Sequence, residues 1–410
     1  MTKPPPAPAM KVPLLDLTQQ YAKIAAEVQS ALMRVCESQQ FILGAQVREL
    51  ELRMARYTHC AHGIGVSSGT DALLLALMAL GIGHGDEVIT SPFTFFATAG
   101  TIARLGARPV FCDIDPKTFN LSPARVEEFI ARECEVRGDG AARHLIHRKT
   151  GGRVRAIMPV HLYGQVCEMD AFMDLAGRLG LHVVEDAAQA IGAEDGTGRM
   201  AGGIGHIGCF SYFPTKNLGA FGDAGLCTTS DADLAERMRI LRVHGAQPKY
   251  HHRLIGGNFR LDELQAAVLN VKLAYLDGWM ELRDEHARQY TQRLKDRFPH
   301  GEVVTPVPRE GGRHVWNQYV IRAQRRDELR QYLAAAGIGT EIYYPIPLHL
   351  QPCFSYLGHH PGELPQSELA AKEVLALPVF PELAPAQIDY VAGTIERFYA
   401  PAGAHSQQSA

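Results

Sequence analysis

This 410-residue chain lacks the features that mark nucleic-acid-binding, membrane and secreted proteins. Its 41 basic residues are balanced by 44 acidic residues, so the charge gives no support for nucleic acid or an anionic membrane as the main partner. The longest apolar stretch, residues 72–83, is too short to span a bilayer. The proline-rich first ten residues have no apolar core of a signal peptide. We therefore expect a soluble, cytoplasmic protein with no nucleic-acid or membrane partner.

The eight cysteines are scattered, with no C-x-x-C pair and no spacing typical of a zinc site. Several lie in apolar stretches, which indicates buried, reduced thiols in a reducing cytosol. The adjacent pairs His251-His252 and His359-His360 have no acidic or cysteine partner at ligand spacing, so we predict no metal site. The sequence also shows no internal repeat.

What the chain does have, between residues 63 and 229, is an alternation of short β-rich runs with helical patterns. This alternation predicts a mostly parallel sheet with helices on both faces, and the continuous apolar runs are typical of strands buried on both sides. We expect strands at residues 64–67, 87–90, 109–112, 156–160 and 182–185, and helices at residues 71–81, 98–105, 123–135 and 170–179.

The second half of the chain predicts a smaller α+β unit. A long connecting helix is expected at residues 261–288, strands at 318–322 and 339–344, and helices at 326–336, 367–375 and 385–399. The fold class is therefore α/β, with a large three-layer α/β/α domain over residues 12–270 and a small C-terminal domain over residues 271–400. Residues 1–11 and 401–410 are predicted to be disordered tails.

Lys216 lies in a turn rich in glycine and hydroxyl groups, F-S-Y-F-P-T-K-N-L-G at 210–219, downstream of V-E-D-A-A-Q at 184–189. Burial lowers the pKa of a lysine, and such an amine can link pyridoxal phosphate (PLP) and move protons. Asp186, at a strand end, can keep the pyridine nitrogen of PLP protonated, and Gln189 can donate to its phenolic oxygen. The alternatives are a solvated lysine, a helix N-cap and a polar helix residue.

A phosphate site is predicted where Ser68, Gly69 and Thr70 precede an apolar helix, because helix N-termini present unpaired N–H groups and a positive dipole. An ordinary N-cap is the alternative. Ser211, five residues before Lys216, is a second candidate phosphate donor. Phe95, in S-P-F-T-F-F-A-T at a strand end, either stacks on a cofactor ring or packs in the core.

Together with G-N-F-R-L-D-E-L-Q-A-A at 257–267 and Y-Y-P-I-P-L-H at 343–349, these motifs resemble the DegT/StrS-type sugar-nucleotide aminotransferases, fold-type I PLP enzymes. The resemblance runs from about residue 12 to residue 399. It implies that Lys216 links the cofactor and shuttles protons, and that Asp186 pairs with the pyridine nitrogen. It further implies that Phe95 stacks on the ring, that Gln189 contacts the phenolic oxygen, and that the phosphate is bound by Gly69, Thr70 and Ser211.

The resemblance also implies a homodimer with shared active sites, in which Asn258 reaches the cofactor phosphate of the other subunit. The implied reaction is a ping-pong transfer from L-glutamate to a nucleoside-diphosphate-linked keto-sugar. Residues 244–262 resemble the branch that aminates C3, and amination at C4 is the alternative. Lys249, His251, His252 and Arg260 are expected to contact the diphosphate or sugar, with a polar surface loop as the alternative for the first three. Tyr343 and Tyr344 are expected to contact substrate.

Three further sequence features allow other interpretations. G-I-G-H-I-G at 203–208 fits a dinucleotide-binding motif, but its third glycine enters a strand, so we expect a tight loop near Lys216. A PLP-dependent sugar dehydratase would carry histidine in place of Lys216, and a non-catalytic PLP-binding regulator would show no half-reaction with glutamate. The basic stretch 132–155 is longer than the family's usual connection, and we expect a solvated insertion.

Overall fold

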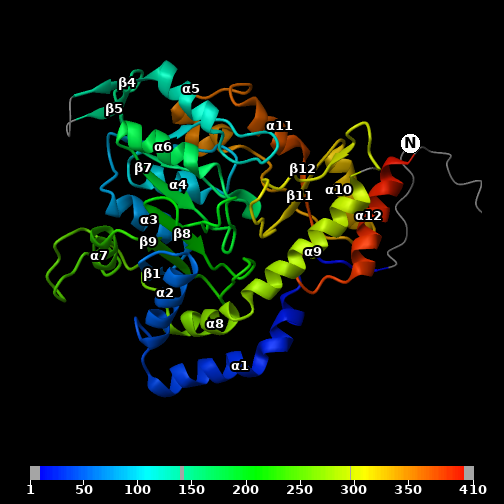
Figure 1. The fold of residues 1–410 in the computed structure, drawn as a ribbon, viewed down its shortest axis with the longest axis horizontal. Helices are drawn as coiled ribbons and strands as arrows, with labels where there is room; N and C mark the ends of the chain where they lie inside the picture. The colour runs from blue at the N-terminus through cyan, green and yellow to red at the C-terminus, as the bar shows by residue number, and fades with distance from the viewer. Residues whose placement is uncertain (1–9, 139–142, 296, 401–410) are drawn as a thin grey trace, which may run out of the picture.

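The computed structural model describes residues 10–138, 143–295 and 297–400, and its larger sheet carries nine strands (Figure 1). Strands β3, β2, β6, β7 and β8 run parallel, while β9 and β1 close one edge in antiparallel pairing. The predicted mostly parallel sheet is therefore confirmed. The strands are β1 (His62–Val66), β2 (Asp86–Thr90), β3 (Arg108–Phe111), β4 (Cys134–Arg137), β5 (His144–His147), β6 (Arg153–Met158), β7 (His182–Asp186), β8 (Ile207–Ser211) and β9 (Gly225–Thr229).

Helices cover both faces of this sheet, each over its own apolar core (Figure 1). On one face pack α3 (Gly69–Ala79), α4 (Ala97–Arg104) and α7 (Ala232–Leu241). On the other pack α2 (Ala45–Tyr57), α5 (Pro123–Glu133), α6 (Met169–Leu179) and α8 (Glu263–Leu273). Helix α1 (Leu17–Ser38) lies against α8. The predicted three-layer α/β/α arrangement is thus present.

A second, three-stranded antiparallel sheet contains β10 (Val303–Val304), β11 (Tyr319–Ala323) and β12 (Val374–Leu377). Around it lie α9 (Leu276–Leu294), α10 (Arg326–Ala335), α11 (Pro365–Glu373) and α12 (Pro385–Tyr399). This part has its own apolar core, which Val12 joins by pairing with Ile338. The predicted tails lie outside the described residues, except for Met10 and Lys11.

Three sequence predictions were wrong in detail. The long helix is divided into α8 and α9 at Ala274 and Tyr275, a break without proline or glycine to signal it. Residues 339–344 form no strand; only Glu341 pairs, with Ala376, before the two prolines of the Y-Y-P-I-P segment turn the chain toward the site.

The basic stretch 132–155, the third of these, is not simply a solvated insertion. Strands β4 and β5 form an antiparallel hairpin, and β5 extends the large sheet by pairing with β6. Cys134 and Leu145 join the core, while His147 makes a 2.8 Å contact with buried Glu87. The hairpin is therefore anchored by burial as well as carrying basic groups on its exposed side. Across the described ranges, no helix combines the length and apolar character needed to cross a bilayer.

Candidate active site

Asp186 ends β7 at the carboxyl edge of the parallel strands, where α/β sheets place their ligands. Its side chain is 4% exposed. The Thr98 hydroxyl donates to Oδ2 at 2.8 Å, and the Ala188 N–H donates to Oδ1 at 3.2 Å. Burial raises the pKa of Asp186, and these hydrogen bonds with the charge of Lys216 oppose that rise. A buried carboxylate with only two donors keeps lone pairs free for a ligand.

Lys216 lies in the loop after β8, and its positive charge acts to lower the pKa of Asp186. Within the described residues its ammonium has no hydrogen bond and no carboxylate at ion-pair distance. Burial lowers the pKa of Lys216 to about 8, against the opposing effect of Asp186. At neutral pH a larger fraction of the amine is therefore neutral than at the ordinary lysine pKa, which favours its action as a nucleophile or proton acceptor.

The N-terminus of α3 lies against Ser211. Ser68 is the N-cap, and its hydroxyl accepts the Asp71 N–H at 3.0 Å, so the N-cap interpretation holds for that hydroxyl. A methyl group at Gly69 would lie 2.5 Å from the Cβ of Ser211, so only glycine permits this approach. Thr70 is exposed beside it. The unpaired N–H groups of the helix and the Ser211 hydroxyl together form a cradle suited to an anion.

Phe95 is 58% exposed, and its ring centroid lies 6.2 Å from that of Tyr344. It is therefore not a core residue. Gln189 accepts the Tyr163 N–H at 2.7 Å and donates to the Tyr344 hydroxyl at 3.1 Å, which ties the small-domain segment to the end of β7. Phe95, Tyr343 and Tyr344 share a cavity of about 390 Å³.

Two of the remaining predicted site residues share a cavity with the N-cap of α3. Asn258 and Arg260 line a cavity of about 540 Å³ with Ser68. Lys249, His251 and His252 are exposed on the preceding loop, and no described contact joins them to Lys216. Lys249 lies over the Tyr250 ring at 5.1 Å, and His252 Nδ1 lies 2.9 Å from the His244 carbonyl oxygen. The structure therefore shows no contact between these three residues and the lysine.

Sequence reasoning missed the groups that support the site. The sequence identifies Thr98 only as a helix residue, and its 3.0 Å hydroxyl contact with Thr94, in the turn before α4, is seen only in the structure. The glycine-rich stretch forms the expected tight loop: the N–H groups of Gly202, Ile204 and Gly205 donate to the Glu185 carboxylate. In the part of the chain described, no three His, Cys, Asp or Glu side chains gather as a metal site.

Comparison with solved structures places this architecture among aminotransferases and related proteins. Streptomyces venezuelae DesV, solved in complex with a ketimine intermediate, is 41% identical with a TM-score of 0.86, over 94% of this chain and 98% of that one. Bacillus subtilis NtdA, solved with the cofactor PMP, is 29% identical with a TM-score of 0.83, over 94% of this chain and 84% of that one.

Curated relatives are similar over nearly their full length. A Geobacillus stearothermophilus protein named pleiotropic regulatory protein is 50% identical, covering 95% of this chain and 99% of the relative. A dTDP-3-amino-3,4,6-trideoxy-alpha-D-glucose transaminase from Streptomyces venezuelae is 42% identical, covering 91% and 92%. The family model of the DegT/DnrJ/EryC1/StrS aminotransferases matches residues 22–396, and this chain belongs to that family.

Proposed function

We propose that the protein is a PLP-dependent aminotransferase that moves an amino group from L-glutamate to C3 of a nucleoside-diphosphate-linked keto-sugar. The observation that carries the proposal is the coupling of Lys216, whose amine has a pKa near 8 and no partner in the described chain, with buried Asp186. The Streptomyces relative, whose name specifies a 3-amino sugar, supports C3 over C4.

The residues present fit PLP. Asp186 has lone pairs left for a protonated pyridine nitrogen, and the exposed face of Phe95 suits an aromatic ring. The close approach of Gly69 to Ser211, with Thr70 beside it, suits the phosphate. The Gln189 amide nitrogen donates to the Tyr344 hydroxyl and has a second N–H left for a ligand oxygen. When bound, PLP supplies an electron sink for the electron pair released at the substrate carbon.

The protein's own groups would supply binding and proton transfer. Lys216 would first link the cofactor and then, as a free amine, move a proton at the substrate carbon, a role typically worth about 10²–10⁴ in rate. Asp186 would keep the pyridine nitrogen protonated, because a carboxylate stabilises a neighbouring cation most strongly where water is excluded. Thr98 would keep Asp186 ionised by donating to it.

We also propose a homodimer in which Asn258, Lys249, His251, His252 and Arg260 serve the partner's site. In support, the loop that carries them is strongly exposed in one chain, with Tyr250 80% and Ile255 93% accessible. Residues 12–270 would carry the cofactor and residues 271–400 the smaller domain, a division supported by the two separate sheets, although Val12 itself packs in the core of the smaller part.

The central test is Lys216→Ala. The purified wild-type protein should absorb at roughly 410–430 nm, as expected of a Schiff base between PLP and a lysine amine. Lys216→Ala should lose this band and the half-reaction with L-glutamate, whereas Lys117→Ala, at an exposed turn, should retain both. A Lys216→Ala protein that still aminates a keto-sugar would refute the mechanism.

Subunit mixing tests the shared site. Inactive Lys216→Ala and inactive Asn258→Ala subunits should regain partial activity as heterodimers, since each heterodimer would contain one intact site. No recovery in verified heterodimers would count against the role of Asn258 across the interface.

A non-catalytic PLP-binding regulator is the second candidate, favoured by the name of the Geobacillus relative. The two candidates differ in one measurement. A regulator would bind PLP without converting L-glutamate to 2-oxoglutarate, whereas the proposed enzyme should complete this half-reaction in a single turnover. The sister dehydratase activity is disfavoured because position 216 carries lysine, not histidine.

A further inference from the structure

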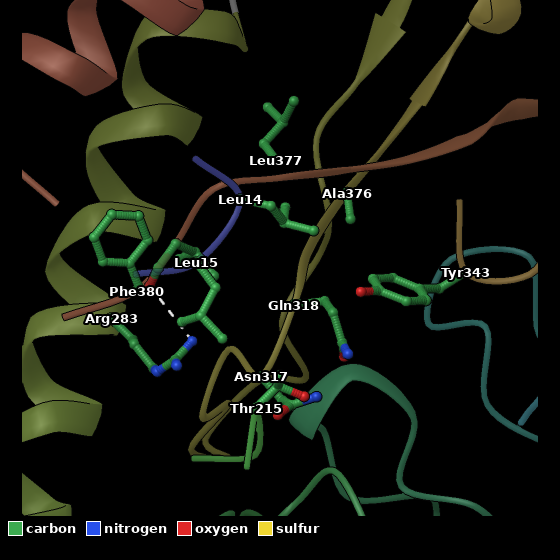
Figure 2. A pocket seen from close by; sticks show the side chains of 11 residues that line it. Leu14, Leu15, Thr215, Arg283, Asn317, Gln318, Tyr343, Ala376, Leu377 and Phe380 are labelled. Atoms are coloured by element: carbon green, nitrogen blue, oxygen red, sulfur yellow. Dashed lines mark hydrogen bonds between the residues drawn. The ribbon is translucent and has the colours of Figure 1, made fainter. Parts of the chain in front are cut away.

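A small cavity adjoins the lysine-bearing loop, between the two parts of the chain. It holds about 110 Å³ and is lined by Thr215, next to Lys216, by Arg283 of α9, by Asn317 and Gln318 before β11, and by Tyr343 (Figure 2). Drug-sized ligands occupy pockets of roughly 300–1,000 Å³, so this cavity suits a small chemical group and not a nucleotide sugar.

The neutral polar side chains around this cavity make no side-chain hydrogen bonds with the described residues. Neither the Thr215 hydroxyl nor the Tyr343 hydroxyl makes a hydrogen bond. The amide oxygens of Asn317 and Gln318 are buried without a donor, and their amide nitrogens also make no hydrogen bond. The two hydroxyls and the two amide NH₂ groups are therefore free to donate to a ligand that accepts hydrogen bonds.

The charge at the cavity is positive. Arg283 is 5% exposed, and its Nη1 donates to the carbonyl oxygens of Trp316 at 3.0 Å and Val379 at 3.5 Å. Within the described chain no carboxylate lies at ion-pair distance from Arg283. The charge of Glu382 acts on Arg283, but the ion pair of Glu382 is with Lys23, at 3.6 Å. Burial lowers the pKa of Arg283 to about 10, against the opposing charge of Glu382.

We infer that this cavity binds one carboxylate of the amino donor, with Arg283 supplying the charge and Asn317 and Gln318 the amide donors. Figure 2 shows the Tyr343 hydroxyl directed into the cavity from the side opposite Arg283, which would close the site around a planar anion. Guanidinium and amide N–H groups match the geometry of a carboxylate. The inference rests on the proposed function. It places the amino donor and the sugar acceptor in different parts of the active site.

Glutarate is the probe, because it carries both carboxylates of glutamate but no amine. It should bind the PLP-loaded wild-type protein in calorimetry. Gln318→Glu, which adds a negative charge, should weaken glutarate binding and lower the kcat/KM for L-glutamate at least tenfold. Gln318→Leu, which removes the amide without adding charge, should lower both about fivefold. The KM for the sugar acceptor should stay unchanged in both variants.

Gln292→Glu is the matched control, since Gln292 is exposed on α9 and its side chain makes no described hydrogen bond. It should leave all these constants at wild-type values. Unchanged glutarate binding in both folded Gln318 variants, or a loss confined to the acceptor, would overturn the inference. A wild-type protein that binds glutarate through Gln318 but shows no half-reaction would instead refute the proposed activity and leave the carboxylate site standing.

Discussion

Glu185 and Asp186 follow one another on β7, and their side chains point to opposite faces of the sheet. Glu185 is completely buried, and its carboxylate accepts three backbone N–H groups from the glycine-rich loop while lying 2.8 Å from His161 Nε2. His161 Nδ1 accepts the Cys167 N–H, so Nε2 carries the hydrogen donated to Glu185. The Glu185 carboxylate is therefore fully hydrogen-bonded within the protein.

Asp186 is also buried but accepts fewer hydrogen bonds. It has one side-chain donor and one backbone donor, an unpartnered lysine nearby, and a pKa raised by burial. A buried carboxylate whose oxygens all accept hydrogen bonds stabilises the fold, whereas a buried carboxylate with few donors is available to a ligand. Exchanging each carboxylate for its amide separates the two roles.

The largest effect is expected from Glu185→Gln. Its amide NH₂ would face backbone N–H donors, which leaves buried donors unpaired, so the free energy of unfolding should fall by about 3–5 kcal/mol. Urea unfolding of the apo-protein measures this. Glu194→Gln, which breaks an ion pair with half-buried Arg313, should cost less than about 1 kcal/mol. If Glu185→Gln kept its stability but lost the cofactor band, Glu185 would belong to the site instead.

Asp186→Asn should lower the activity without lowering the stability of the apo-protein. The half-reaction with L-glutamate should slow about 100-fold, equivalent to about 2.7 kcal/mol, because the pyridine nitrogen would lose its counter-charge. Burial raises the pKa of Asp186 in the folded state, so its ionisation destabilises the fold as pH rises through that pKa. Above that pH, the apo-variant should therefore unfold at the same or higher urea concentration than wild type. Wild-type single-turnover rates in Asp186→Asn would contradict the assignment.

Much of the fold could be predicted, because local patterns and burial agree. The predicted strand at 182–185 is β7, and the predicted helix at 170–179 is α6, which ends at the left-handed Gly180. What failed depended on tertiary contacts. The hairpin β4–β5 reads as a polar insertion, yet Leu145 and Ile146 are buried against the sheet. The break at Ala274 carries no turn residue.

Site residues could be predicted where the chemistry requires a particular residue type. They could not be predicted where the residue acts only through its contact with another side chain. Lys216 and Asp186 stand out by type and by position at strand ends. Thr98, Asn317 and Gln318 do not, because a threonine in a helix or an amide before a strand has many ordinary roles. Only the three-dimensional arrangement reveals that one donates to Asp186 and that the other two make no side-chain hydrogen bond in the described chain.

The smallest effect is expected from Thr98→Val, which makes Asp186 still less satisfied. Removing the 2.8 Å hydrogen bond from the Thr98 hydroxyl takes a donor from the ionised carboxylate, so the pKa of Asp186 should rise further. Because the ionised carboxylate is the active form, activity is lost as pH falls through this pKa. The acid limb of the pH–rate profile for the glutamate half-reaction should therefore move to higher pH, with little change above pH 8.

Thr101→Val supplies the matched control for this shift. Thr101 is equally buried on α4, but its hydroxyl bonds only to the carbonyl oxygens of Ala97 and Thr98. It should leave the acid limb in place. A shift of equal size in both variants would mean that the helix, and not the hydrogen bond, sets the titration. A shift in Thr98→Val alone would show that the site depends on how incompletely Asp186 is satisfied, the property that distinguishes it from Glu185.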